Sequence, residues 1–311
     1  MILSASRRTD IPAFFGEWWM NRIKEGYVYW VHPFNPKQVK VISLAPQDVD
    51  AIVFWTKNPQ PFLKYLDEMD SRGYRYYFTF TLNDYPKELE PNVPKVEARI
   101  ETFQQLSEKI GPKKVIWRYD PIIISSTTPF DYHLQKISSI SNDLKGYTHR
   151  LVISFLDFYA KTNNKLKKLQ KAHGIRFMDI REKNYREEMI SFCWNVQQIC
   201  AENGIEVVSC AEKADLTEAG IQPGSCIDGE LLEKLFYLGK VYKKDSNQRP
   251  ECGCVQSVDI GVYNTCLFDC QYCYAVQSKK AVQNRLKKHD KNSPALIGDF
   301  KTSLASERTE V

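Results

Sequence analysis

The stretch Val258-Asp-Ile-Gly-Val-Tyr263 precedes Cys266-Leu-Phe-Asp-Cys270-Gln-Tyr-Cys273, a C-x3-C-x2-C run. The apolar stretch predicts a strand, so the cysteines lie in a loop that follows a strand closely. Three thiolates this close in sequence can bind three irons of a cubane iron–sulfur cluster, and no cysteine follows Cys273 to bind the fourth. The fourth iron would stay open, as the fourth position of a catalytic zinc does, and could bind a chelating molecule.

A zinc site, a disulfide and a buried cysteine cluster are the other interpretations of this run. Zinc sites more usually pair C-x2-C units or combine them with histidines, and none of the five histidines is close to the run. Nine cysteines in a chain of 311 residues favour metal ligation and buried thiols, because disulfide scaffolds are typical of short secreted proteins.

Composition sets wide limits on the protein class. A chain with 43% hydrophobic and 13% aromatic residues can bury a substantial core. The sequence opens on Ile2-Leu-Ser-Ala without a basic leader, and no apolar run reaches membrane-spanning length, so we expect a cytoplasmic protein without a membrane partner. The net charge of +5 permits an anionic partner but does not require one. The preferred interpretation of a basic run at 279–288 is a solvated helix face, and nucleic-acid contact is the alternative.

Apolar strands alternate with amphipathic helices along most of the chain. This rhythm is typical of βα units and predicts an α/β fold with a parallel sheet. The expected strands are 2–6, 51–55, 74–82, 114–119, 151–155, 205–210 and 257–263, and the expected helices are 12–23, 61–72, 93–110, 130–144 and 186–203. A long polar connection separates 155 from 186.

The domain organisation expected from this pattern is a single domain at 1–290. It would carry an inserted hairpin at 27–45, where two aromatic and β-branched segments flank a turn, and a cysteine-rich segment at 210–273. Residues 291–311 would form a C-terminal tail. No internal repeat or convincing linker precedes 290, which argues against a separate iron–sulfur domain.

The cysteine spacing, with Tyr272 directly before the last cysteine, resembles the signature of the radical S-adenosylmethionine (radical SAM) superfamily. Four other stretches resemble an uncharacterised bacterial family with such a C-terminal motif, distantly like the DNA-photoproduct lyases; they are Ser6-Arg-Arg-Thr-Asp-Ile-Pro12, Phe54-Trp-Thr-Lys-Asn-Pro59, Trp117-Arg-Tyr-Asp-Pro121 and Cys252-Gly-Cys254. The resemblance implies a 4Fe-4S cluster held by Cys266, Cys270 and Cys273, whose open iron binds S-adenosylmethionine.

The resemblance also implies a partial or complete (β/α) barrel. Radical SAM enzymes normally carry the cysteine loop after their first strand, whereas here it follows the last one. A circular permutation would explain this order. The strand before the cysteines should then lie beside the N-terminal strand Ile2 to Ser6.

Polar residues gather where the expected strands end. In βα barrels these ends build the active site, although each residue could also be a surface or helix-capping residue. Given the resemblance, we expect Arg118 to bind the carboxylate of S-adenosylmethionine, Thr9 or Asp10 to lie near its amine, and Tyr272 to pack near its adenine. The further candidates are Lys57 and Asp120 as catalytic residues, and Ser154 and Glu212 as cofactor-binding residues.

A second set of four cysteines comprises Cys210, Cys226, Cys252 and Cys254. If the fold brings them together, they could close a second 4Fe-4S cluster, such as radical SAM enzymes use for electron transfer or substrate binding. A four-cysteine zinc site and simple burial are the alternatives. Cys193 and Cys200, seven residues apart on one helix face, are expected to be core residues.

The functional expectation is a radical SAM enzyme that takes electrons from a flavodoxin- or ferredoxin-like donor. Its substrate would be a nucleic acid, a peptide or a small molecule. One competing interpretation is an iron–sulfur electron carrier or redox sensor, although a carrier usually closes its cluster with four cysteines. Another is a zinc-stabilised nucleic-acid-binding protein.

Overall fold

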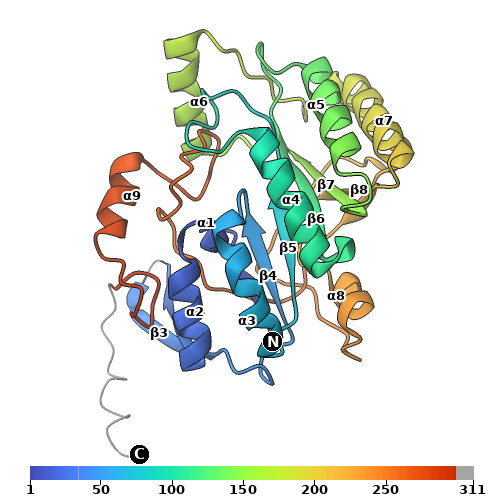
Figure 1. Cartoon of the computed structure of the whole chain (residues 1–311). Helices are drawn as coiled ribbons and strands as arrows, with labels where there is room; N and C mark the ends of the chain where they lie inside the picture. Colours follow the sequence, from blue (N-terminus) through green and yellow to red (C-terminus); the bar gives the residue numbers. More distant parts are fainter. Residues whose placement is uncertain (34, 299–311) are drawn as a thin grey trace, which may run out of the picture.

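The computed structural model describes residues 1–33 and 35–298. Eight strands form one sheet in the order β10-β1-β4-β5-β6-β7-β8-β9, and all neighbouring strands run parallel (Figure 1). They are β1 (Ile2–Ala5), β4 (Ala51–Thr56), β5 (Tyr76–Thr81), β6 (Val115–Ile122), β7 (Arg150–Phe155), β8 (Glu206–Cys210), β9 (Gln222–Gly224) and β10 (Val258–Asp259). The expected α/β fold with a parallel sheet is confirmed.

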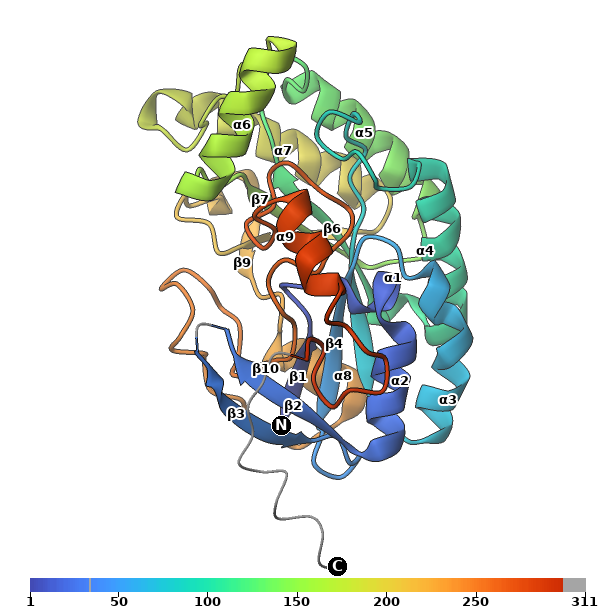
Figure 2. The ribbon, with the colours of Figure 1, turned by 90° about the vertical axis from the view of Figure 1, so that its left-hand side faces the viewer.

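The helices connect these strands and flank the sheet. They are α1 (Ile11–Phe14), α2 (Gly16–Glu25), α3 (Leu66–Ser71), α4 (Val96–Ile110), α5 (Phe130–Asp143), α6 (Ala160–His173), α7 (Arg186–Glu202), α8 (Gly229–Phe236) and α9 (Lys279–Leu286). Figure 2 shows α2, α3, α4 and α5 along one side of the sheet, with the antiparallel hairpin of β2 (Tyr27–His32) and β3 (Asn35–Ser43) on the other. The predicted hairpin is therefore confirmed in the part described.

The two faces of the sheet bury different cores. In β4, Ile52 and Phe54 pack into the large core that the helices cover, whereas Ala51 and Val53 contribute to a second core on the opposite face. Alternation along a strand produces this division, because successive side chains point to opposite faces. The second core also contains Cys226 and other residues of the cysteine-rich segment, including Leu232 of α8, so that segment covers the face of the sheet opposite α2, α3, α4 and α5.

The two ends of the chain meet in this sheet. Leu3 pairs with Val258 and Ser4 with Asp259, so β1 and β10 are parallel neighbours. This pairing confirms the expectation that the strand before the cysteine run lies beside the N-terminal strand. Within residues 1–33 and 35–298 the sheet is open, with β10 and β9 at its edges, so of the expected partial or complete barrel the complete form is not observed.

Three local expectations were wrong. No strand was expected at β9, an edge strand paired with β8, whose Pro223 is tolerated because an edge strand need not donate every ladder bond. The polar connection after β7 contains α6, whose many lysines obscure its apolar stripe. The helix expected over 12–23 is divided at Phe15, where the backbone leaves the helical region.

Residues 291–298, the described part of the expected tail, lie against α2. The Trp18 indole donates a hydrogen bond to Ser293 O (2.9 Å), and Arg22 donates to Asn292 O (3.0 Å). The remainder of the tail, 299–311, lies outside the described residues. Among the helices that the structure describes, none combines the length and the apolar character needed to cross a bilayer.

Candidate functional site

The three cysteines of the C-x3-C-x2-C run lie together in a loop after β10, here called the cysteine loop (residues 264–275). Cys270 is buried, and Cys266 and Cys273 are half-buried against an apolar cluster that includes Phe268. Burial raises the pKa of Cys266, and the neighbouring Asp10, Cys270 and Cys273 raise it further. The thiols are therefore close enough to interact electrostatically. A cationic metal would favour their thiolate forms, so this donor set fits an iron–sulfur cluster.

Asp259 fastens the start of this loop to β1. Its carboxylate accepts hydrogen bonds from the hydroxyls of Ser4 (3.0 Å) and Ser6 (2.8 Å) and from the backbone N–H of Arg7 (2.9 Å). A side chain at Gly261 would overlap the Ser6 hydroxyl, so this approach of the two segments requires glycine. The position of the cysteine loop is thus set by the N-terminal strand.

Thr9 and Asp10 hold the next part of the same junction. The Thr9 hydroxyl lies 2.7 Å from that of Thr265 and accepts the backbone N–H of Val262 at 2.9 Å. Asp10 caps α1 by accepting Ala13 N–H (3.0 Å) and also accepts Lys57 N–H (2.7 Å). Burial raises the pKa of Asp10 to about 7, despite these hydrogen bonds.

A buried polar network lies beside Cys270. Lys57 Nζ is 2.8 Å from Glu90 Oε1, and the Tyr272 hydroxyl donates to the same oxygen. Burial raises the pKa of Cys270, whereas the positive charge of Lys57 opposes that effect. Lys57 and Tyr272 were candidates from the sequence, but Glu90 was not. It lies in an irregular segment after β5, where no pattern distinguishes it from a surface carboxylate.

The second set of cysteines also converges. Cys210 Sγ lies 2.7 Å from Cys226 Sγ, and Cys254 Sγ accepts the backbone N–H of Ile227, the residue after Cys226, at 3.4 Å. The neighbouring Cys226 and Cys252 lower the pKa of Cys254, and Cys226 lowers that of Cys210. All four thiols are free, and 2.7 Å exceeds the roughly 2.05 Å of a disulfide.

The sulfur separation of Cys210 and Cys226 is neither that of a disulfide nor that of two ligands of one metal. In the described residues, no three or more His, Cys, Asp or Glu side chains are spaced as metal ligands. Two sulfurs around a tetrahedral zinc would lie roughly 3.8 Å apart, given Zn–S bonds of about 2.3 Å. A metal would require the Cys210 and Cys226 side chains to separate from 2.7 Å. As a donor set, four thiols suit iron–sulfur or zinc equally.

Arg118 faces this second set. Its guanidinium donates to Cys226 Sγ and to the carboxylate of Asp120, which also accepts the Ser154 hydroxyl. Residues 116, 118 and 120 of β6 point to the same face by strand alternation, which brings Arg118 over the cysteine-rich segment. The structure thus unites Arg118, Asp120 and Ser154 with the second cysteines.

Arg7 lies between the two cysteine sets. The guanidinium carbons of Arg7 and Arg118 are 5.3 Å and 4.9 Å from the centre of the Trp55 ring. Burial by itself lowers the pKa of Arg7, but Cys254, Asp259 and Cys226 raise it above its usual value. Arg7 Nη2 and Trp55 Nε1 are buried and have no hydrogen-bond partner among the described residues. Two donors thus remain available to a ligand at the ends of β1 and β4.

The family model of a domain of unknown function, DUF1848, matches residues 2–275. The chain belongs to this family. The DUF1848 match begins at β1 and ends two residues after Cys273, so it covers the whole sheet and both cysteine sets. No curated protein matches the sequence.

The predicted site residues of this DUF1848 protein fall into two groups. Thr9, Asp10, Lys57 and Tyr272 surround the cysteine loop, and Arg118, Asp120 and Ser154 lie at the second set. Glu212 stands apart: it accepts the backbone N–H of Phe155 (2.7 Å), and burial raises its pKa to about 7. Cys193 and Cys200 are fully buried in the helix-side core, as expected.

Proposed function

We propose that this DUF1848 protein is a radical SAM enzyme. The observation that carries the proposal is the position of the cysteine loop: three clustered thiols directly follow a strand that pairs in parallel with the N-terminal strand. A loop after the first strand is where radical SAM enzymes carry their cysteines. The open parallel sheet, with β10 taken as the first strand, then corresponds to a circularly permuted partial barrel.

The cysteine loop would hold a 4Fe-4S cluster through Cys266, Cys270 and Cys273. Together with S-adenosylmethionine, such a cluster supplies reductive cleavage to a 5'-deoxyadenosyl radical, which abstracts hydrogen from a substrate. The chain's own contribution is position and charge. Lys57 and Glu90 form a buried ion pair beside Cys270, and Tyr272 donates to Glu90, so the aromatic ring is held against the loop.

The polar ends of β1 and β4 would bind the polar groups of the cofactor or substrate. Arg118, the carboxylate partner expected from the sequence, is engaged by Asp120 and Cys226. Arg7, with an unpaired buried nitrogen, is better available for a carboxylate. Asp10 near Cys266, with its raised pKa, can hold a proton or accept an amine.

The second set of cysteines would hold an auxiliary 4Fe-4S cluster. Two guanidinium groups, from Arg7 and Arg118, compensate the negative charge that four thiolates bring. The proposal includes a flavodoxin- or ferredoxin-like donor, a cytoplasmic setting and a substrate that is a nucleic acid, a peptide or a small molecule.

Formation of 5'-deoxyadenosine tests the proposal. Anaerobically reconstituted, reduced protein is given S-adenosylmethionine beside two variants, Cys273→Ala and Cys193→Ser. We expect product from the native protein and from Cys193→Ser, whose thiol lies in the helix-side core, but not from Cys273→Ala. Absence of product from native protein with confirmed iron and sulfide, across several reductants, would contradict the proposal and favour an electron carrier or sensor.

A further inference from the structure

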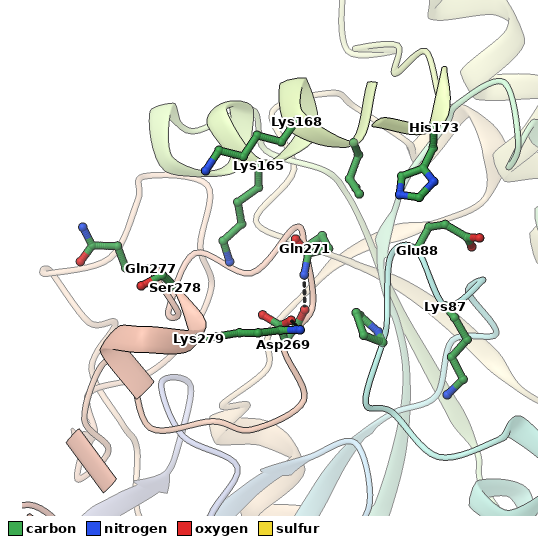
Figure 3. A pocket seen from close by; sticks show the side chains of 12 residues that line it. Lys87, Glu88, Lys165, Lys168, His173, Asp269, Gln271, Gln277, Ser278 and Lys279 are labelled. Atoms are coloured by element: carbon green, nitrogen blue, oxygen red, sulfur yellow. Dashed lines mark hydrogen bonds and ion pairs between the residues drawn. The ribbon is translucent and has the colours of Figure 1, made fainter. Parts of the chain in front are cut away.

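A cavity of about 550 Å³ opens beside the cysteine loop (Figure 3). Three segments far apart in sequence line it: the segment after β5, the inner face of α6, and the cysteine loop with the start of α9. Its size falls within the roughly 300–1,000 Å³ that is typical of small-molecule sites. Asp269 and Gln271, the two neighbours of Cys270 in sequence, form part of the wall.

Lysines from all three segments face this cavity. They are Lys87, Lys165, Lys168 and Lys279, against two carboxylates, Glu88 and Asp269. Two of the lysines already have partners. Lys279 Nζ pairs with Asp269 at 3.2 Å, and Lys87 Nζ donates to Val93 O at 2.6 Å.

Lys165 differs from the two paired lysines of this cavity. Its Nζ is buried, yet it has no hydrogen-bond partner among the described residues. Figure 3 shows its side chain extending from α6 toward Asp269 and Gln271. No ion pair joins it to either carboxylate in the described part of the chain. A buried ammonium without an acceptor is costly, so an acceptor from outside the chain would complete this site.

The part of the wall formed by the start of α9 suits an anion, whereas the carboxylates of Glu88 and Asp269 lie on other parts of the wall. Ser278 caps α9, an eight-residue helix whose positive end therefore lies at the cavity, with Gln277 beside it. A phosphate group matches an ammonium, a helix N-terminus and neutral donors together. Two exposed lysines, Lys280 on α9 and Lys287 at its C-terminal cap, add positive charge beyond the cavity, and phosphate contacts of a nucleic-acid strand are made by such side chains.

We propose that this cavity binds the phosphate of a nucleotide unit, and that the natural ligand is a single-stranded nucleic acid. Only one part of this inference rests on the proposed function: because the cavity adjoins Cys270, the bound strand would be the substrate of the enzyme. Phosphate binding itself needs neither a cluster nor S-adenosylmethionine. A failure of the radical chemistry and a failure of phosphate binding are therefore separable.

The test measures binding of a fluorescently labelled 12-nucleotide single strand to the purified protein by anisotropy, without reductant or S-adenosylmethionine. Native protein is compared with Lys165→Gln, Lys165→Arg and Lys168→Gln. The matched control is Lys167→Gln, an exposed residue of the same helix that does not line the cavity. Thermal unfolding of each variant verifies that it is folded.

We expect Lys165→Gln to weaken strand binding about tenfold and to reduce the slope of log affinity against log salt by about 0.7, the value for one contact to a single strand. Lys165→Arg should retain binding, and Lys167→Gln should match native protein. Inorganic phosphate and adenosine monophosphate serve as competitors. If they bind and the strand is no tighter, a free nucleotide is the ligand and the phosphate site stands.

Two outcomes overturn the proposal. One is that neither the strand nor either competitor binds native protein. The other is that Lys165→Gln and Lys167→Gln weaken binding equally, since this would mean a diffuse basic surface rather than a built site.

Discussion

Lys57 Nζ lies 2.8 Å from Glu90 Oε1, where the Glu90 side chain is 2% exposed and that of Lys57 14%. Burial raises the pKa of Glu90, but the charges of Lys57 and Arg99 outweigh that effect and lower it below its usual range. These two cations therefore favour the charged form of the buried Glu90 carboxyl. Each charge there depends on the other, next to the thiol of Cys270.

Replacing Lys57 by Met should consequently destabilise the protein by about 3 kcal/mol, because a buried carboxylate loses its counter-charge. Urea unfolding measures the change. The matched control is Lys234→Met, since Lys234 and Glu230 form an exposed pair at 3.8 Å and should matter by less than about 1 kcal/mol. The double variant Lys57→Met with Glu90→Gln should recover part of the loss. Equal effects at Lys57 and Lys234 would contradict this account.

The carboxylate of Asp259 is the main polar link between β10 and β1. Asp259→Ala should cost about 2 to 4 kcal/mol, because it leaves the Ser4 and Ser6 hydroxyls and the Arg7 N–H without an acceptor. Hydrogen exchange should show lost protection at Val262 and Ile260, with the central strands β5 and β6 unchanged. Uniform loss of protection across the sheet would instead indicate global destabilisation.

Glu212 should make stability dependent on pH in the neutral range. Its pKa in the folded protein is raised to about 7 by burial, above its value in the unfolded chain. A carboxyl group raised in this way favours folding at low pH, and the advantage is lost as pH rises through 7. The stability of native protein relative to Glu212→Gln should therefore fall by about 1 to 3 kcal/mol between pH 5 and pH 8. Glu187→Gln, at an exposed position on α7, should show no such trend.

The two sets of cysteines should bind metal independently. Anaerobically prepared Cys226→Ser and Cys270→Ser should each lose about half of the iron and acid-labile sulfide of native protein, because each removes one cluster. The control Cys193→Ser should lose none. Loss of zinc rather than iron from Cys226→Ser would assign the second set to zinc, and full iron retention would show that it binds no cluster.

Much of the sheet could be predicted from the sequence. Alternation of apolar strands with helices identified seven of its strands. The expectation that β10 lies beside β1 came from the resemblance of the late C-x3-C-x2-C run to a cysteine loop that normally follows the first strand. The edge strand β9 was missed because three residues that include a proline and a glycine carry no strand signal. Helix α6 was missed because lysines and asparagines dominate its composition.

The candidate site could be predicted only in part. Residue type indicated the cysteines, and strand ends indicated Lys57, Asp10 and Arg118. Glu90 and Arg7 belong to the candidate site because they are buried or half-buried and contact residues far away in sequence. No local sequence pattern indicates such contacts. Arg118 shows the same limit: its position on β6 was correct, but the fold supplied Cys226 as a neighbour, 108 residues further along the chain.

The pairing of β1 with β10 also dictates an order of events during synthesis. Ser6 leaves the ribosome 253 residues before its partner Asp259, which at about 5–20 residues per second is a delay of roughly 10 to 50 s. Throughout that time β1 has an unoccupied edge, and the thiols of the cysteine loop have not yet been made. Pairing of the cysteine loop with the N-terminal strand is therefore a late step of synthesis, and a nascent chain that stalls before residue 259 lacks both the partner of Ser6 and the cysteine loop.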